Sequence, residues 1–187
     1  MDQFLGSGTT LIEAKLLNRN AIGVDINPQA IELARNNLEF DVQKSPRIEL
    51  RNGTATELDF LKDNSIDLIC THPPYADIIH YSRDISGDLS RLPFIQFEQE
   101  MEKVASEAYR VLKPKKICAY MIGDIRVHGN VIPLGFETMG IFCKKGFALK
   151  EIVIKEQHNC RSSRYWEDKK RSFLLLAHEY IFVLEKS

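Results

Sequence analysis

Residues 2–10 read Asp2-Gln3-Phe4-Leu5-Gly6-Ser7-Gly8-Thr9-Thr10, a glycine-rich turn that runs directly into a helical pattern. Glycines let the backbone approach a ligand closely, and the helix that follows presents free N–H groups. Such a turn normally follows a buried strand, yet only Met1 precedes it in this sequence. The stretch predicts a cofactor loop of an α/β fold, and an ordinary tight turn is the alternative at this point.

Composition is consistent with one globular domain over residues 1–187. The chain is 44% hydrophobic with a formal net charge of -1, so it has no overall basic signature for nucleic acid. None of its four cysteines forms a C-x-x-C pair, which favours buried thiols and a reducing, cytoplasmic setting. No signal peptide or membrane-length apolar run is visible.

Beyond the turn, short apolar runs alternate with helical patterns. Asn27 is expected to cap a helix that begins at Pro28, and Pro114 is expected to end the long helix that carries Phe97 and Val111. The predicted helices cover 9–17, 28–38, 97–113 and 136–145, and the predicted strands cover 21–25, 47–51, 66–70, 117–122, 148–155 and 174–184. This alternation predicts a mostly parallel sheet with helices on both faces, with the last two strands antiparallel.

Ligands of such folds bind at the carboxyl ends of the strands, where three further motifs lie. Asp25 ends the run AIGVD about twenty residues after the turn, where a carboxylate can accept both ribose hydroxyls. Helix capping is its alternative role, but Asn27 already serves that. Residues 52–55, Asn-Gly-Thr-Ala, could line an adenine pocket or form an ordinary turn.

The fourth motif, Thr71-His72-Pro73-Pro74-Tyr75, follows the run IDLIC. Its two prolines offer carbonyl groups without N–H groups, which suits the recognition of an exocyclic amino group. Tyr75 can stack on a planar base. A purely structural Pro-Pro loop is the alternative, but it does not explain why a polar and an aromatic residue flank the prolines.

Taken in order, these motifs resemble the amino-group DNA methyltransferases, which methylate the amino nitrogen of cytosine or adenine. That family's cofactor loop reads D-P-F-x-G-S-G-T-T and its catalytic loop D/N/S-P-P-Y/F/W, against DQFLGSGTT and THPPY here. The stretches RVLKPKKICAYMI and AHEYIFVLEK are similar to the family's last regions, so the resemblance covers nearly the whole chain.

The resemblance implies a Rossmann-like fold that binds S-adenosylmethionine. Asp2, Phe4, Gly6 and Gly8 would hold its methionine part, Asp25 its ribose and Thr54 its adenine, with Thr71 nearby. Ser7, Thr9 and Ile26 complete the expected cofactor-binding set. His72, Pro73, Pro74 and Tyr75 form the expected catalytic set, because they would hold the target amino group while its nitrogen attacks the sulfonium methyl. No metal is required.

Two residues depart from the family pattern. Gln3 replaces proline, which we expect to have a mild effect. His72 replaces Asp, Asn or Ser, and only a neutral imidazole can accept a hydrogen bond. Activity is therefore expected to fall as the pH drops through the pKa of His72. Thr71 slightly favours cytosine over adenine as the target.

Two segments carry the expected nucleic-acid contacts, and a target base within duplex DNA would have to be flipped out to reach Tyr75. Residues 161–171 interleave basic and aromatic side chains, although a solvated hairpin tip explains this segment equally well. The expected contacts are Tyr81, Arg83, Arg161, Arg164, Trp166, Lys169 and Lys170. Neither segment has the length of a separate target-recognition domain.

Other readings stay open. An RNA methyltransferase of similar fold shares a Pro-Pro-aromatic loop, and a non-catalytic remnant or subunit would explain His72. A dinucleotide dehydrogenase is less favoured, because Leu11 stands where the third glycine of G-x-G-x-x-G should be. The strand before the glycine turn lies at the centre of this fold. We therefore expect a domain truncated at its N-terminal side, or one that a preceding segment or a second chain completes.

Overall fold

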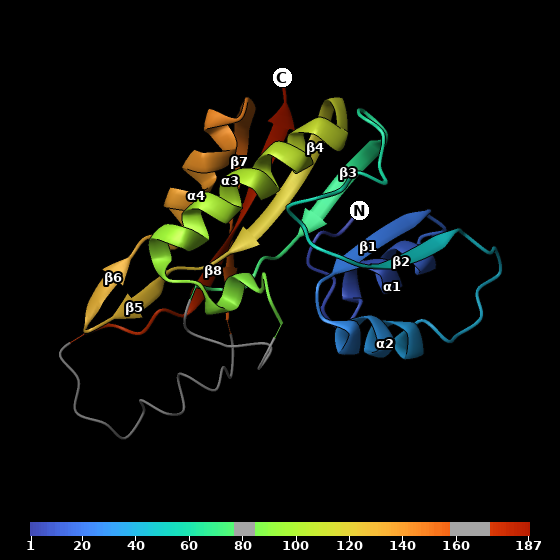
Figure 1. Cartoon of the computed structure of the whole chain (residues 1–187), viewed down its shortest axis with the longest axis horizontal. Coiled ribbons are helices and arrows are strands. Elements are labelled where there is room, and N and C mark those ends of the chain that lie inside the picture. The colour runs from blue at the N-terminus through green and yellow to red at the C-terminus, as the bar shows by residue number, and fades with distance from the viewer. Residues whose placement is uncertain (77–84, 158–172) are drawn as a thin grey trace.

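The computed structural model describes residues 1–76, 85–157 and 173–187. Helices and strands alternate along most of the chain, as Figure 1 shows. The helices are α1 (Thr9–Leu16), α2 (Pro28–Asn37), η1 (Leu89–Arg91, a 3-10 turn), α3 (Phe94–Val111) and α4 (Leu134–Lys144). The strands are β1 (Ala21–Asp25), β2 (Ile48–Asn52), β3 (Ile66–Thr71), β4 (Leu112–Ile122), β5 (Ile125–Val127), β6 (Asn130–Ile132), β7 (Phe147–Glu156) and β8 (His178–Lys186).

The strands form a two-stranded parallel sheet, β1-β2, and a four-stranded sheet in the order β3-β4-β8-β7. Strands β3 and β4 are parallel, whereas β8 runs antiparallel to both of its neighbours. The prediction of an α/β fold with a mostly parallel order and an antiparallel final strand is confirmed. A small hairpin, β5-β6, stands apart from both sheets.

Met1 and Asp2 connect the two sheets by main-chain hydrogen bonds. The Met1 amino group donates to the Leu68 carbonyl at 2.7 Å, and the Cys70 N–H donates to the Met1 carbonyl at 3.0 Å. On the other side, the Asp2 N–H donates to the Ile22 carbonyl, and the Val24 N–H donates to the Asp2 carbonyl, both at 2.9 Å. These two residues occupy the line of a central parallel strand. Within the described ranges, β1 and β3 lie in separate sheets that these two residues bridge.

Helices α3 and α4 cover one face of the four-stranded sheet (Figure 1). One stripe of α3 is fully buried there, so each of its larger side chains contributes about 1.5–3 kcal/mol of burial free energy. The stripe consists of Phe97, Met101, Val104, Ala105, Ala108 and Val111. It packs on the sheet's inward-facing side chains, which include Ile69, Cys118, Tyr120, Phe182 and Leu184.

The opposite face of this sheet is less protected. Leu68 on β3 is 48% exposed and Val153 on β7 is 47% exposed. Met121, Ile181 and Val183 on the same face are only partly buried. Sheets with parallel strands are usually covered on both faces. The prediction of helices on both faces is therefore not met here, because this face of the four-stranded sheet has no covering layer among the described residues.

Three details of the secondary structure differ from expectation. The last strand, predicted over 174–184, covers His178–Lys186. Helix α3 ends at Val111, and β4 begins at once, so Pro114 does not end the helix. Pro114 lies where the β3-β4 register shifts, between the pairs Ile66–Leu112 and Leu68–Ile117, and a bulge tolerates its missing N–H. The β5-β6 hairpin was not predicted, because three-residue strands show no periodicity.

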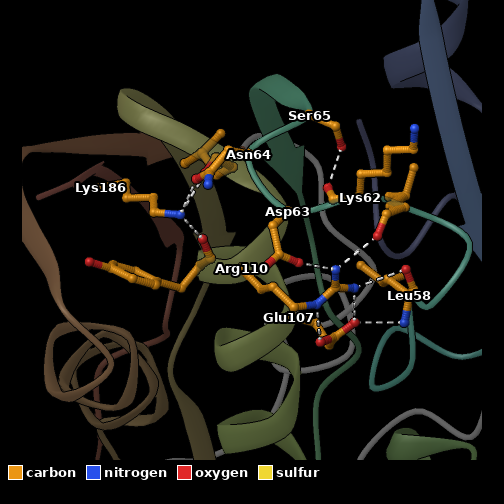
Figure 2. A network of polar contacts seen from close by, with 11 residues as sticks. Leu58, Lys62, Asp63, Asn64, Ser65, Glu107, Arg110 and Lys186 are labelled. Atoms are coloured by element: carbon orange, nitrogen blue, oxygen red, sulfur yellow. Dashed lines mark hydrogen bonds and ion pairs between the residues drawn. The ribbon is translucent and has the colours of Figure 1, made fainter.

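A polar network holds the amino end of β3 against α3 and β8 (Figure 2). Arg110 donates to the carbonyls of Leu58 and Leu61 and pairs with Glu107 and Asp63, which holds the preceding loop on α3. Lys186 donates to Asn64 and to the carbonyls of Tyr109 and Leu112. The strand that carries the THPPY motif at its other end is therefore firmly placed. In the described parts of the chain, no helix is long and apolar enough to cross a membrane.

Candidate active site

The glycine turn adopts the geometry that its sequence predicts. Gly6 and Gly8 have φ angles of 52° and 88°, in the left-handed region that favours glycine. A Cβ on Gly8 would lie 2.9 Å from the Ala34 Cβ, whereas a Cβ on Gly6 would meet no atom within 4 Å. The turn thus packs tightly against α2 at Gly8 and leaves open space beside Gly6, just before α1 begins at Thr9.

Asp25 joins this turn from the end of β1. Its carboxylate accepts hydrogen bonds from the Gly6 N–H at 2.8 Å and from the Asn27 N–H at 2.9 Å. The Asn27 side chain caps α2 by accepting from the Gln29 N–H, as predicted. Because a carboxylate can accept about four hydrogen bonds, Asp25 keeps capacity for ligand hydroxyls.

Asp2 brings the end of β3 to the same place. Its Oδ1 atom accepts from the Phe4 N–H and from the Thr71 hydroxyl, both at 3.1 Å. Burial raises the pKa of Asp2 to about 6, against hydrogen bonds that act in the opposite direction. The Asp2 carboxyl group therefore joins the first motif to the fourth, and Asp25 joins the second motif to the first through the Gly6 N–H.

Gln3 has a larger structural role than expected, because its replacement of proline was predicted to have only a mild effect. Its side chain is buried and its amide donates to the carbonyls of Ala55 and Val104 at 3.4 Å. Its main-chain N–H donates to the Thr71 hydroxyl at 3.2 Å, a hydrogen bond that proline cannot make. Gln3 thus joins the cofactor loop to α3 and β3.

The Asn52–Ala55 motif lies beside the end of β1. Asn52 donates to the carbonyls of Asp25 and Ile26, and the Thr54 and Thr56 hydroxyl oxygens lie 2.7 Å apart. The residues expected around ribose and adenine are therefore neighbours. Because the Thr54 hydroxyl already contacts the Thr56 hydroxyl, a ligand bound to Thr54 would share that hydroxyl with Thr56.

In the catalytic loop, Tyr75 and His72 both approach Glu179 on β8. The Tyr75 hydroxyl donates to Glu179 Oε1 at 2.8 Å and accepts from the Gly123 N–H at 3.0 Å. His72 Nε2 lies 3.6 Å from the same oxygen and has no hydrogen-bond partner among the described residues. Burial lowers the pKa of His72, while Glu179 opposes this shift and Lys155 adds to it.

Sequence reasoning missed Glu179 as a site residue, although the ending AHEYIFV contained it. An acidic residue at the start of an apolar run was the available signal, because such residues are rarely buried without a partner. A second polar cluster follows β4, where Tyr180 donates to Asp124 at 3.1 Å and lies 3.0 Å from His178 Nε2. Among the described residues, no group of three His, Cys, Asp or Glu side chains could hold a metal ion.

The expected nucleic-acid contacts all lie outside the described residues, within 77–84 and 158–172. They are Tyr81, Arg83, Arg161, Arg164, Trp166, Lys169 and Lys170. These expectations stay predictions.

A glycine turn, a strand-end carboxylate and a Pro-Pro-Tyr loop on this sheet order define an S-adenosylmethionine-dependent methyltransferase fold. A family model described as a methyltransferase domain matches residues 1–174, and the chain belongs to that family. The expectation of this fold and of its cofactor is confirmed at that level.

Curated relatives include Type II methyltransferases and tRNA methyltransferases. The Type II beta methyltransferase M.BslI of Bacillus sp. (strain NEB-606) is 29% identical over 156 residues, covering 75% of this chain and 16% of the relative. The orphan methyltransferase M.BamHII of Bacillus amyloliquefaciens is 28% identical, covering 66% and 40%. A tRNA (guanine(10)-N2)-dimethyltransferase of Pyrococcus abyssi is 28% identical, covering 78% and 40%. The chain thus spans less than half of each of these relatives.

Solved structures agree on the fold. An S-adenosylmethionine-dependent methyltransferase of Methanosarcina mazei superposes with a TM-score of 0.67 at 17% identity, covering 99% of this chain and 90% of that one. TrmN from Thermus thermophilus gives a TM-score of 0.62 at 18% identity, covering 100% and 43%. A candidate DNA modification methylase, also of Thermus thermophilus and in complex with S-adenosyl-L-methionine, gives 0.52 at 24% identity, covering 72% and 51%.

Proposed function

We propose that this chain transfers a methyl group to an exocyclic amino nitrogen of a nucleic-acid base, with DNA as the substrate. The observation that supports this most is the meeting of the cofactor loop and the THPPY loop at Asp2 and Thr71. The amino-directed chemistry rests on Pro73 and Pro74, which offer acceptors only. DNA is favoured because several of the curated relatives are Type II methyltransferases.

S-adenosylmethionine would supply an electrophilic methyl group on a sulfonium centre, and the residues around the turn fit it. Open space beside Gly6 admits a ligand close to the backbone. Asp25 keeps lone pairs for ribose hydroxyls, and Thr54 lies near the end of β1 for the adenine. The buried carboxyl of Asp2 suits an ammonium group, because a cation would offset the cost of ionising it there.

The catalytic loop would hold the base while the amino nitrogen attacks the methyl carbon. The C–N bond would form as the C–S bond breaks, the sulfur would leave as a neutral thioether, and the nitrogen would then release one proton to water. The proline carbonyls and a neutral His72 would accept the amino hydrogens and orient the nitrogen lone pair. Cytosine as the preferred target over adenine rests on Thr71 alone and is part of the proposal.

RNA is the second candidate substrate, because tRNA (guanine(10)-N2)-dimethyltransferases are also among the relatives. The purified chain is tested with tritiated cofactor on unmethylated genomic DNA and on a tRNA transcript. Label in DNA supports the proposal, and label in tRNA alone overturns its substrate. Cofactor binding without transfer to either would identify a non-catalytic remnant.

Calorimetry with S-adenosylmethionine tests the cofactor site separately. Asp25→Ala is expected to weaken binding at least tenfold, because it removes the carboxylate proposed to accept the ribose hydroxyls. Asp59→Ala removes an exposed carboxylate of the loop before β3 and serves as the control. Equal affinities of the two variants would exclude Asp25 as a cofactor ligand.

We also propose that a strand from a preceding segment or a second chain completes the sheet. The separation of β1 and β3 into two sheets that Met1 and Asp2 bridge supports this. The exposed apolar face at Leu68 and Val153 offers a surface for a second chain. Sedimentation tests the second-chain form, in which Leu68→Glu should dissociate a dimer. A monomer unaffected by that change would leave only the preceding-segment form.

A further inference from the structure

Glu179 is a buried carboxylate that the proposed chemistry does not use directly. Its side chain is only 6% exposed, at the start of β8 behind the catalytic loop. It contacts Tyr75, His72 and Lys155, which come from the loop after β3 and from β7. A buried charge is costly unless it is paired, so these contacts account for its ionised state.

The first contact fixes the position of Tyr75. Its hydroxyl donates to Glu179 Oε1 at 2.8 Å and accepts from the Gly123 N–H at 3.0 Å, so both functions of the phenol are engaged. The ring is held from two directions, by β8 and by the residue that follows β4. Any stacking by Tyr75 would therefore occur from a fixed position.

The second contact bears on the tautomer of His72. Its buried Nε2 atom lies 3.6 Å from Glu179 Oε1 and has no other partner among the described residues. A carboxylate can only accept a hydrogen bond, so a proton on Nε2 is the favourable arrangement there. In that tautomer Nδ1 carries no proton and can accept one.

The third contact keeps Glu179 charged. Lys155 Nζ donates to Oε2 at 2.7 Å, on the oxygen that Tyr75 does not use. Burial raises the pKa of Glu179, but the hydrogen bonds from Lys155 and Tyr75 outweigh it, so the pKa stays below its ordinary value. The charged groups that act on His72 from β8 and β7 are thus Glu179 and Lys155.

We propose that Glu179 is a positioning residue that keeps the proton of His72 on Nε2 and holds Tyr75 in place, which leaves Nδ1 to accept a hydrogen bond from the target amino group. This inference rests on the proposed function and names how a histidine can replace the usual acceptor of the motif. Glu179 acts through His72 and Tyr75 and need not touch the substrate.

Nitrogen-15 NMR of the full chain with labelled histidine tests the tautomer without any activity. We expect the Nε2–H form of His72 in the unmodified protein and a shift toward Nδ1–H in Glu179→Gln, whose amide can donate to Nε2. Glu185→Gln on the same strand, which removes a carboxylate paired with Lys150, is the matched control. An Nδ1–H form in the unmodified protein, or a spectrum that Glu179→Gln leaves unchanged, overturns the inference.

Kinetics separate positioning from folding. Glu179→Gln is expected to lower kcat at least tenfold with the cofactor KM within twofold, and to move the acidic limb of the pH profile to lower pH. Glu179→Asp keeps the charge and should recover part of the loss, whereas Tyr75→Phe tests the hydroxyl anchor alone. An unmoved acidic limb refutes the role of Glu179. Absence of methyl transfer by the unmodified chain would refute the proposed function and leave the tautomer result standing.

Discussion

Asp2→Asn is expected to stabilise the protein while it weakens cofactor binding. The pKa of Asp2 rises from 3.8 to about 6 because the carboxyl group is buried. The folded protein therefore binds more protons than the unfolded chain between these values, and this group's contribution to stability falls as the pH rises. At about 1.4 kcal/mol per pKa unit, the full cost of ionising Asp2 is about 3 kcal/mol.

Asparagine does not titrate, and its oxygen can still accept from Phe4 and Thr71. The free energy of unfolding of Asp2→Asn should therefore exceed that of the unmodified protein by an amount that grows with pH. Integration between the two pKa values gives a growth of about 2 kcal/mol from about pH 4.5 to about pH 7.5. The affinity for S-adenosylmethionine should fall about tenfold or more, because a charged hydrogen-bond acceptor is lost.

Urea unfolding followed by circular dichroism at several pH values measures the difference. Asp67→Asn is the control with the opposite sign. The hydrogen bond from Lys113 lowers the pKa of Asp67, so its contribution to stability is present at neutral pH and is lost on acidification. A difference between Asp2→Asn and the unmodified protein that stays constant with pH would refute the buried-carboxyl reasoning.

Three further predictions concern the turn, the polar network and the catalytic loop. Gly8→Ala should cost about 2 kcal/mol or more in unfolding free energy, because its Cβ meets Ala34, whereas Gly6→Ala should cost about 1 kcal/mol. Gly6→Ala should nevertheless weaken cofactor binding more. Urea unfolding and calorimetry distinguish the two variants, and equal stabilities would contradict the packing argument. Arg110→Ala should lose about 2 kcal/mol in the same unfolding assay, since among the described residues it leaves two carbonyls without a donor and Glu107 with only the Leu58 N–H. A loss under about 0.5 kcal/mol would show that water replaces the network. Methyl transfer should fall with an acidic limb below pH 6.5, because burial lowers the pKa of His72, and His72→Asn should remove that limb.

The sequence predicted the strand ends well because main-chain geometry there depends on local residues. Glycine at positive φ, the Asn27–Pro28 helix start and the acidic end of β1 each act within a few residues. Parallel strands then bring these local features to one edge of the sheet.

Long-range partnerships were not predictable in this way. Glu179 meets Tyr75 across 104 positions of the chain, and no local pattern encodes that contact. Gln3 was read as a mild substitution because its effect depends on Ala55 and Val104, which are distant in sequence. Pro114 was read as the end of a helix because a bulge depends on the register with a neighbouring strand.

Met1 and Asp2 link the two sheets through the main chain, and the proposed cofactor site spans the junction between those sheets. Asp25 belongs to the smaller sheet and Thr71 to the larger one, and a pair of main-chain hydrogen bonds on each side of Met1–Asp2 joins the strands there. A ligand that binds both Asp25 and Thr71 would therefore connect the two sheets. By mass action, such a ligand would stabilise the folded arrangement in which the two sheets are held together.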